Sequence, residues 1–277
     1  MTNNKAVLIS GASTGIGFST ALLLKDNGFT VFAGVRKAED FERLNSLGFN
    51  SIYLDITDKE SVEQAYDLVK ASGFELAGLI NNAGVAIAGP AEFLPVEKYQ
   101  EQINVNLLGH IAVTQKFMPL IRENKARIIN ITSIAGFCAF PFNSAYCVSK
   151  FGLEAYSRSL RLELKQWGVE VISVQPGVVE TPIWEKSKAV ARVNFEGLPS
   201  RALDLYGKIL QSLENAEQKN MTSPEKVAEA VYTALSSKKP KSRYLVGIDA
   251  HFLNIVSKLP PEVLEWLLSI KLKSKLG

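Results

Sequence analysis

The chain has 277 residues, of which 47% are hydrophobic and 21% charged, so it can bury a large core and is not a disordered protein. This length fits one large α/β domain, because such domains commonly exceed 200 residues. The net charge is only +3 and no basic cluster interleaves with aromatic residues, which excludes a nucleic-acid-binding surface of the usual kind.

The cysteine and histidine content excludes two further classes of protein. Cys138 and Cys147 cannot supply a disulfide framework, and together with His110 and His251 they show no metal-ligand spacing, so we expect no metal site. The sequence has neither an apolar run of about 18 residues nor a charged segment followed by a signal-like apolar one. We therefore expect a cytoplasmic protein.

Apolar runs and helical patterns alternate along the chain. The first run, Lys5–Ser10, is continuously apolar, as in strands buried on both faces of a parallel sheet. A helical pattern follows it and ends at Asn27-Gly28. The expected strands are then 29–35, 51–54, 76–81, 127–132, 169–175 and 243–246, and the expected helices are 15–27, 40–47, 59–71, 96–123, 145–167 and 223–236. This alternation predicts an α/β fold with a doubly wound parallel sheet and helices on both faces.

Two segments do not follow the alternation. Residues 183–221 are too long for an ordinary connection, and we expect them to form a lid over a substrate site. Residues 262–273 predict an amphipathic helix with Val263, Trp266 and Ile270 on one side. This helix, in a lysine-rich tail, either covers the cleft, contacts another subunit or lies on a membrane surface.

A glycine-rich turn separates the first strand from the first helix, in the run Ser10-Gly11-Ala12-Ser13-Thr14-Gly15-Ile16-Gly17. Glycines in this position allow a tight turn and the close approach of a pyrophosphate, whose charge the free N–H groups of the helix N-terminus stabilise. The turn therefore predicts a dinucleotide site. The alternative is a turn whose glycines serve only the packing of the helix.

A tyrosine and a lysine lie four residues apart in a predicted helix, so Tyr146 and Lys150 share one face. A free tyrosine has a pKa of about 10, and we expect the nearby ammonium to lower the pKa of Tyr146 towards neutrality. Ser133 ends the preceding strand, at the sheet edge where such folds bind ligands, and its hydroxyl can stabilise charge on a carbonyl oxygen. Together the three residues predict acid–base chemistry. The alternative is that Tyr146 and Lys150 are only neighbours on a solvated helix face and that Ser133 is only a turn residue.

Five ordered motifs resemble those of the short-chain dehydrogenase/reductase family in its single-domain form, with the pattern T-G-x-x-x-G-x-G, N-N-A-G, Ser, Y-x-x-x-K and P-G. They lie at residues 10–17, with Ser10 in place of threonine, and at 81–84, 133, 146–150 and 176–177. The resemblance is close over residues 5–182. It implies a single Rossmann-type domain and an oxidoreductase that transfers a hydride between a nicotinamide and a substrate carbon, with Tyr146 as general acid or base.

The resemblance also implies a role for each matching residue. The implied catalytic residues are Asn106, Ser133, Tyr146 and Lys150, and Asn106 holds a water that relays protons to the lysine. Asp55 would meet the adenine amino group and Thr181 the nicotinamide carboxamide. The expected cofactor-binding residues are Gly11, Ser13, Thr14, Gly15, Ile16, Gly17, Arg36, Asp55, Ile56, Asn82, Ala83, Gly84, Tyr146, Lys150, Pro176, Gly177, Val179 and Thr181.

The residues after the second strand favour NADP(H) over NAD(H). An acid there would accept hydrogen bonds from the ribose and repel a 2′-phosphate, but the strand ends in Val35 and Arg36-Lys37 follows. Arg36 can pair bidentately with a phosphate, and the Ser13 and Thr14 hydroxyls can add donors. The alternative is that Arg36 only faces solvent.

The segment between Ser133 and Tyr146 is rich in aromatic residues and poor in charge, so we expect it to wall an apolar pocket. The early half of the chain resembles the branch of the family with steroid and retinoid dehydrogenases, which implies a lipophilic ketone, aldehyde or alcohol as substrate. A catalytically idle NADP(H)-binding sensor or scaffold is the alternative. A nucleotide-sugar epimerase of the longer relatives fits poorly, because only about 100 residues follow Pro176.

Two predicted helices, 96–123 and 145–167, resemble the dimer interface of the family. On the second, Phe151, Ala155, Leu162 and Trp167 provide apolar area beyond the face that covers the sheet. We therefore expect a homodimer or homotetramer, because an isologous contact would bury that surplus. The alternative is that Phe151 and its neighbours pack under the long loop.

Overall fold

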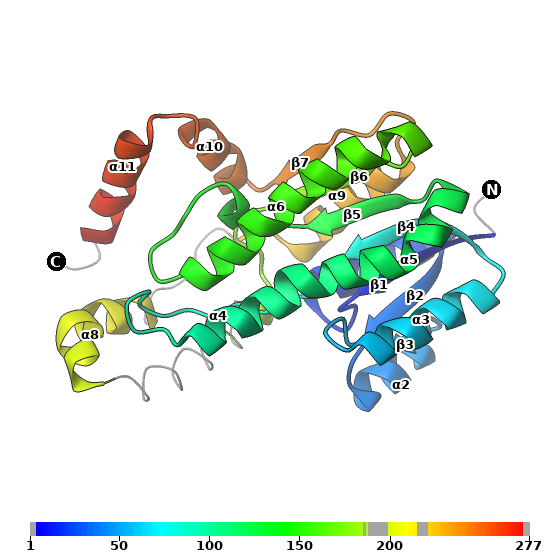
Figure 1. The fold of residues 1–277 in the computed structure, drawn as a ribbon, viewed down its shortest axis with the longest axis horizontal. Helices are drawn as coiled ribbons and strands as arrows, with labels where there is room; N and C mark the ends of the chain where they lie inside the picture. Colours follow the sequence, from blue (N-terminus) through cyan, green and yellow to red (C-terminus); the bar gives the residue numbers. More distant parts are fainter. Residues whose placement is uncertain (1–3, 185–186, 188–198, 215–220, 274–277) are drawn as a thin grey trace.

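The computed structural model describes residues 4–184, 187, 199–214 and 221–273 (Figure 1). Within them, one sheet has the order β3-β2-β1-β4-β5-β6-β7, and every neighbouring pair of strands is parallel. The strands are β1 (Lys5–Ser10), β2 (Thr30–Val35), β3 (Asn50–Tyr53), β4 (Glu75–Asn81), β5 (Arg127–Ile131), β6 (Val171–Pro176) and β7 (Arg243–Val246). The order reverses between β1 and β4, which places a ligand crevice at the carboxyl ends of these two strands.

Helices cover both faces of the sheet, so the predicted doubly wound α/β fold is confirmed (Figure 1). Helices α1 and α9 pack together on one face, and α3, α5 and α6 cover the other. The bounds of these and two further helices are α1 (Gly15–Asp26), α2 (Ala38–Ser46), α3 (Lys59–Ala71), α4 (Val96–Ile103), α5 (His110–Asn124), α6 (Ser144–Leu164) and α9 (Pro224–Ser236).

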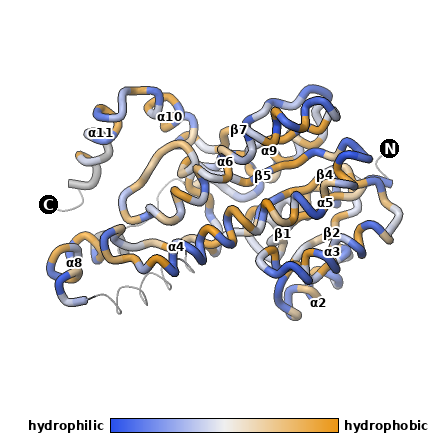
Figure 2. The backbone as a smooth tube through the Cα atoms, viewed as in Figure 1, coloured by the Kyte–Doolittle hydropathy of each residue, from blue (hydrophilic) through white to orange (hydrophobic). Residues whose placement is uncertain are grey.

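Alternate residues of each central strand contribute to two separate cores. In β1, Val7 and Ile9 face the side of α1 and α9, whereas Leu8 faces the side of α3, α5 and α6, and all three are fully buried. Figure 2 shows the resulting hydrophobic stretches on the central strands. The strands are continuously apolar because both of their faces are covered.

The expected helix 96–123 is interrupted in the structure. It comprises α4, a π-helical segment η1 (Asn104–Gly109) and α5. A π-helical segment accommodates an extra residue within a helix, and such segments occur frequently at functional sites. Most other predicted elements lie within two residues of their expected bounds. The end of the expected helix 145–167 is a 3₁₀ turn, η3 (Lys165–Trp167), and another, η2 (Ile134–Gly136), follows Ser133.

The expected lid contains a helix, α8 (Ser200–Glu214), while 185–186, 188–198 and 215–220 lie outside the described residues. Tyr206 of α8 makes edge-to-face contacts with Phe93 and Phe142, at ring-centroid distances of 6.0 and 5.9 Å. Its hydroxyl donates a hydrogen bond to Glu92 over 3.1 Å. Phe142 therefore seats α8 in this structure, and the role of α8 as a lid stays a prediction.

The chain ends in two helices, α10 (Ile248–Val256) and α11 (Pro261–Lys273). Helix α10 is not among the helices expected above, and its apolar Ile248, Phe252 and Ile255 are exposed and give no buried stripe. The expected helix 262–273 is present as α11, with Val263 and Trp266 exposed, and its function stays a prediction. Among the described residues, no helix combines the length and apolar character needed to span a membrane.

Candidate active site

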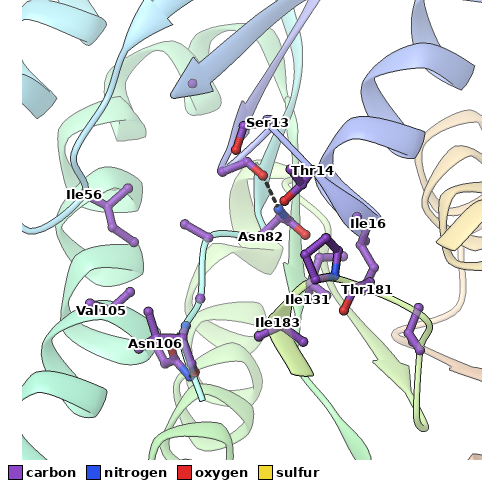
Figure 3. Close-up of a pocket in the computed structure, with 18 of the residues that line it drawn as sticks. Ser13, Thr14, Ile16, Ile56, Asn82, Val105, Asn106, Ile131, Thr181 and Ile183 are labelled. Atoms are coloured by element: carbon purple, nitrogen blue, oxygen red, sulfur yellow. Dashed lines mark hydrogen bonds between the residues drawn. The ribbon is translucent and has the colours of Figure 1, made fainter. Parts of the chain in front are cut away.

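A cleft of about 250 Å³ lies at the carboxyl ends of β1, β2, β4, β5 and β6, at the crossover point of the sheet (Figure 3). All four catalytic candidates line it: Asn106, Ser133, Tyr146 and Lys150. The expected cofactor-binding residues line it as well, with the exception of Gly17. In Figure 3, Ile56 and Val105 lie across the cleft from Thr181 and Ile183.

Hydrogen bonds between the ends of β1 and β4 shape the floor of the cleft. The Asn82 side chain donates to the carbonyl oxygens of Ser10 and Gly11, over 3.0 and 2.9 Å. In return, the buried Ser10 hydroxyl accepts from the backbone N–H groups of Asn82 and Ala83. Ser10, which stands where the family pattern has threonine, thus keeps a hydroxyl that joins the glycine turn to the segment after β4.

Side chains on the glycines of the turn would collide with neighbouring segments. Gly11 and Gly15 have φ angles of +67° and +55°, which favour glycine. A Cβ atom on Gly11 would lie 2.8 Å from the backbone of Ala83, and one on Gly15 would lie 2.9 Å from Thr181. No acid stands in the first turn of α1, and its N-cap residue, Thr14, makes no side-chain cap. These features fit the pyrophosphate of a dinucleotide.

Gly17 does not line the cleft but supports it from behind. A Cβ atom there would lie 2.2 Å from the Gly11 carbonyl oxygen and 2.5 Å from Nδ2 of Asn82. The residue therefore serves the close packing of α1 against the turn, as the alternative interpretation of these glycines requires.

Three of the four catalytic candidates come from the turn after β5 and from α6. Ser133 is buried, its hydroxyl accepts from the Ala135 N–H over 3.1 Å, and it is hydrogen-bonded to Tyr146. Lys150 is also buried, and its Nζ donates to the Ile131 carbonyl oxygen over 2.9 Å. The same Nζ lies 5.7 Å from the centroid of the Tyr146 ring. A hydroxyl pair and an ammonium thus face one end of the cleft.

The expected lowering of the Tyr146 pKa is wrong for this structure. Burial raises the pKa of Tyr146 to about 12, although the hydrogen bond with Ser133 acts in the opposite direction. Burial also lowers the pKa of Lys150 to about 8, against the attraction of Glu154. The physical reason is that burial desolvates the phenolate, and this effect outweighs the hydrogen bond with Ser133.

Asn106 uses its whole side chain to hold the segment after β4. Its Oδ1 accepts from the Val85 N–H and its Nδ2 donates to the Val85 carbonyl, both over 2.9 Å. Nδ2 also donates to the Ser149 hydroxyl over 3.3 Å. These bonds tie the π-helical segment Asn104–Gly109 to the segment after β4 and to α6.

The outer end of the cleft carries the residues that would distinguish the two cofactors. Arg36 is exposed and its guanidinium lies 3.8 Å from the Asp55 carboxylate. Burial disfavours the charge of Asp55, but hydrogen bonds from Thr57 and the charge of Arg36 outweigh it and lower the carboxyl pKa. Asp55 is thus held by Thr57 and Arg36 at the edge of the cleft.

Sequence reasoning missed a second arginine beside the glycine turn. Arg43 donates to the Ser13 carbonyl over 2.6 Å and pairs with Asp40 at 3.0 Å, and Asp40 itself lines the cleft. Helical spacing places Asp40 and Arg43 on one face of α2, but only the packing of α2 on the turn brings them to the site. Lys37 also lines the cleft without having been predicted, and Ile183 and Trp184 line it from the start of the segment expected to form the lid.

Comparison with known proteins identifies the class. The short chain dehydrogenase family model matches residues 5–191. Retinol dehydrogenase 5 of Homo sapiens is 38% identical over 285 residues, covering 96% of this chain and 89% of its own. The mitochondrial D-beta-hydroxybutyrate dehydrogenase of Rattus norvegicus is 36% identical over 263 residues, covering 87% and 76%. A structure of serine dehydrogenase complexed with NADP+ has a TM-score of 0.73 at 25% identity, covering 87% of this chain and 94% of its own.

The chain belongs to the short-chain dehydrogenase/reductase family. It is an oxidoreductase of a family that uses a nicotinamide cofactor.

Two glycines of the chain make a matched test of the packing behind the cleft. We expect Gly17→Ala to destabilise the fold by roughly 1 to 3 kcal/mol, because its Cβ would overlap the turn. Gly207→Ala on α8 meets no atom within 4 Å, and we expect it to be neutral or stabilising by up to about 1 kcal/mol. Urea unfolding of both variants measures this, and a Gly17→Ala protein as stable as wild type would contradict it.

Proposed function

We propose that the protein is an NADP(H)-dependent dehydrogenase/reductase of an apolar carbonyl or alcohol substrate, with Tyr146 as general acid or base. The observation that carries the proposal is the meeting of Ser133, Tyr146 and Lys150 at one end of a cleft whose other end holds the glycine turn and Arg36. A sensor or scaffold would need the turn but not this hydroxyl pair and lysine.

The cofactor would lie along the glycine turn, with its phosphates at the N-terminus of α1 and its nicotinamide near Gly177 and Thr181. The nicotinamide supplies or accepts the hydride when it is bound. Ser133 would hold the substrate oxygen while Tyr146 gives or takes the proton at that oxygen. Because its pKa is raised to about 12, Tyr146 is protonated at neutral pH, as the reduction of a carbonyl requires.

Further assistance would come from Lys150 and Asn106. The Lys150 ammonium is oriented by the Ile131 carbonyl and lies beside the Tyr146 ring, where it favours proton transfer through charge. Asn106 fixes Val85 and touches Ser149, which precedes Lys150. It therefore holds the wall of the cleft opposite α6 at a fixed distance and, as the family resemblance implies, would hold the relay water there.

The apolar substrate is supported by the surroundings of Ser133. Residues 133–143 contain no charged side chain, but of this segment only Ser133 lines the cleft, so the expected aromatic wall is not part of it; the apolar Ile183 and Trp184 line the cleft instead. Of the two relatives above, one is named for retinol and the other for a hydroxy acid. A steroid-, retinoid- or other lipophilic ketone, aldehyde or alcohol fits best.

Replacement of the proposed acid tests the function. We expect Tyr146→Phe to lower turnover by about 10² to 10⁴ with every accepted substrate while NADPH still binds, because only proton transfer is removed. Steroids, retinoids, aliphatic ketones and quinones form the substrate panel, followed by NADPH absorbance. Tyr156→Phe is the matched control, since Tyr156 lies on α6 with a pKa also raised to about 12 but does not line the cleft. Full turnover by Tyr146→Phe, or none by wild type, would end the proposal.

The cofactor preference depends on Arg36. We expect Arg36→Leu to weaken NADPH binding about ten- to a hundredfold and NADH binding much less, because a lost charged hydrogen bond costs roughly 1.5 to 3 kcal/mol. The closed form of serine dehydrogenase is complexed with NADP+, which supports this preference. Fluorescence titration measures both affinities, with Arg122→Leu on the remote α5 as control. Equal losses for both cofactors would show that Arg36 does not recognise the phosphate.

Exposed apolar side chains on α6 and on the η3 turn after it support a homodimer. Phe151, Leu162 and Trp167 are exposed, and Leu162 is 77% exposed, which leaves apolar area for a contact between subunits. We expect sedimentation at micromolar protein to give at least twice the 30.4 kDa of one chain. Phe151→Arg should favour the monomer, whereas Leu68→Arg on α3 should not. A single monomeric species for wild type would refute the dimer.

A further inference from the structure

A buried glutamate on α6 lies directly behind the proposed catalytic groups. Glu154 is only 3% exposed, and it follows Lys150 by one helical turn and Tyr146 by two. Its Oε1 accepts hydrogen bonds from the Thr132 hydroxyl and from Nε2 of Gln175, both over 2.6 Å. Its Oε2 accepts from the Ser173 hydroxyl over 3.3 Å. All three donors are buried, so one carboxylate joins α6 to two neighbouring strands.

These bonds fix the two places where the strands end at the site. Thr132 follows β5 and directly precedes Ser133. Gln175 lies in β6 and directly precedes Pro176-Gly177, which lines the cleft. On the same side, Lys150 donates to the carbonyl of Ile131, the residue before Thr132. Lys150 and Glu154 therefore hold consecutive residues of one strand end.

The turn that carries Ser133 is pressed against the same part of α6. A Cβ atom on Gly136 would lie 2.9 Å from Cγ of Glu154 and 3.0 Å from the Lys150 carbonyl oxygen. Only glycine therefore allows η2 this close to α6. The position of Ser133 relative to Tyr146 is set by this contact as well as by Thr132.

A buried carboxylate is a costly way to obtain packing alone. The desolvation of such a group costs several kcal/mol unless charge and hydrogen bonds offset it, and apolar residues of similar volume often serve stability as well or better. Three donors and a lysine one turn away are the compensation that Glu154 has. The burial of the Glu154 carboxylate is explained if its negative charge is needed at the site.

We propose that Glu154 is a positioning residue of the oxidoreductase, which aligns Ser133 and the Pro176-Gly177 turn with α6 and provides the buried counter-charge of the Lys150 ammonium. The proposal rests on the proposed function, because it assigns Glu154 to the reaction that Ser133, Tyr146 and Lys150 perform.

The charges around Lys150 agree with this role. Burial lowers the pKa of Lys150, and the charge of Glu154 raises it. On α5, the buried His110 faces the same ammonium, but its pKa is lowered to about 3 by burial and by Lys150, so it is neutral. On α6, Tyr146 is protonated at neutral pH, and Arg161, which donates to the carbonyls of Val171 and Ser242, is a second cation whose pKa the charge of Glu154 raises. Glu154 is thus the negative charge that favours a protonated Lys150.

The test compares Glu154→Gln with Glu163→Gln, which removes the same charge from an exposed position on the same helix. The pKa of Lys150 is measured by NMR on protein with labelled lysine, assigned with Lys150→Arg, and the pH profile of kcat/KM is measured with the best substrate of the panel. We expect Glu154→Gln to lower the pKa of Lys150 by about one pH unit and to move the alkaline fall of the profile to lower pH. We expect Glu163→Gln to match wild type.

Three results would overturn the proposal. One is an unchanged Lys150 pKa in Glu154→Gln. Another is a pH profile of kcat/KM identical to that of wild type in both height and position. The third is a uniform loss of kcat at every pH without a shift, which a merely structural role would give. Where Glu154→Gln does not fold, Glu154→Asp decides, since a retained charge with a shorter reach should lower kcat and keep the wild-type profile. A shifted profile or an unchanged kcat would then refute it.

The two proposals fail in different ways. The Lys150 titration needs no turnover, so it tests the counter-charge even where wild type reduces nothing in the panel. Turnover by wild type that Tyr146→Phe abolishes, together with an unshifted Glu154→Gln, would leave the proposed function intact and remove only the role of Glu154.

Discussion

The Asn82 side chain donates hydrogen bonds to the carbonyl oxygens of Ser10 and Gly11, and it can do so only because neither Gly11 nor Gly17 carries a Cβ atom. This contact joins the ends of β1 and β4, the two strands between which the sheet reverses its order. If the turn stood further out, the N-terminus of α1 would face away from the crevice. A few residues further along the same segment, Val85 is held by Asn106, so the segment after β4 is bonded to the glycine turn on one side and to the π-helical segment on the other.

Helix α6 organises the opposite side of the cleft. Tyr146, Lys150 and Glu154 follow one another at intervals of one turn, so a single helix face presents a proton donor, a cation and an anion in order of increasing burial. Each is tied to β5 or to the turn after it, through Ser133, Ile131 and Thr132 respectively. Such groups need little reorganisation when charge develops on a substrate, which is the condition for electrostatic catalysis.

The chain order of strands and helices could be predicted because each apolar run is short and ends in glycine or a polar cluster, and the glycine turn and the Tyr146–Lys150 spacing are local patterns. Features that depend on packing could not be predicted. The pKa of Tyr146 depends on how deeply the packed structure buries its hydroxyl, and Arg43 reaches Ser13 only because α2 packs against the glycine turn. A glutamate within a helix is usually exposed to solvent, and the burial of Glu154 becomes evident only when α6 is packed against β5 and β6. In α10, by contrast, Ile248, Phe252 and Ile255 recur at helical spacing, so this helix could have been predicted from the sequence although the residues are exposed.

The π-helical segment at Asn104–Gly109 couples the site to the core through the phase of a helix. An extra residue turns everything after it by about 100° relative to an uninterrupted α-helix. The buried side chains of α5, such as Val113 and Phe117, are in register with the sheet only in that rotated phase, while Asn106 lies within the segment itself. Loss or gain of a single residue here would therefore rotate α5 relative to α4. It would misplace a wall of the cleft and one face of the core together.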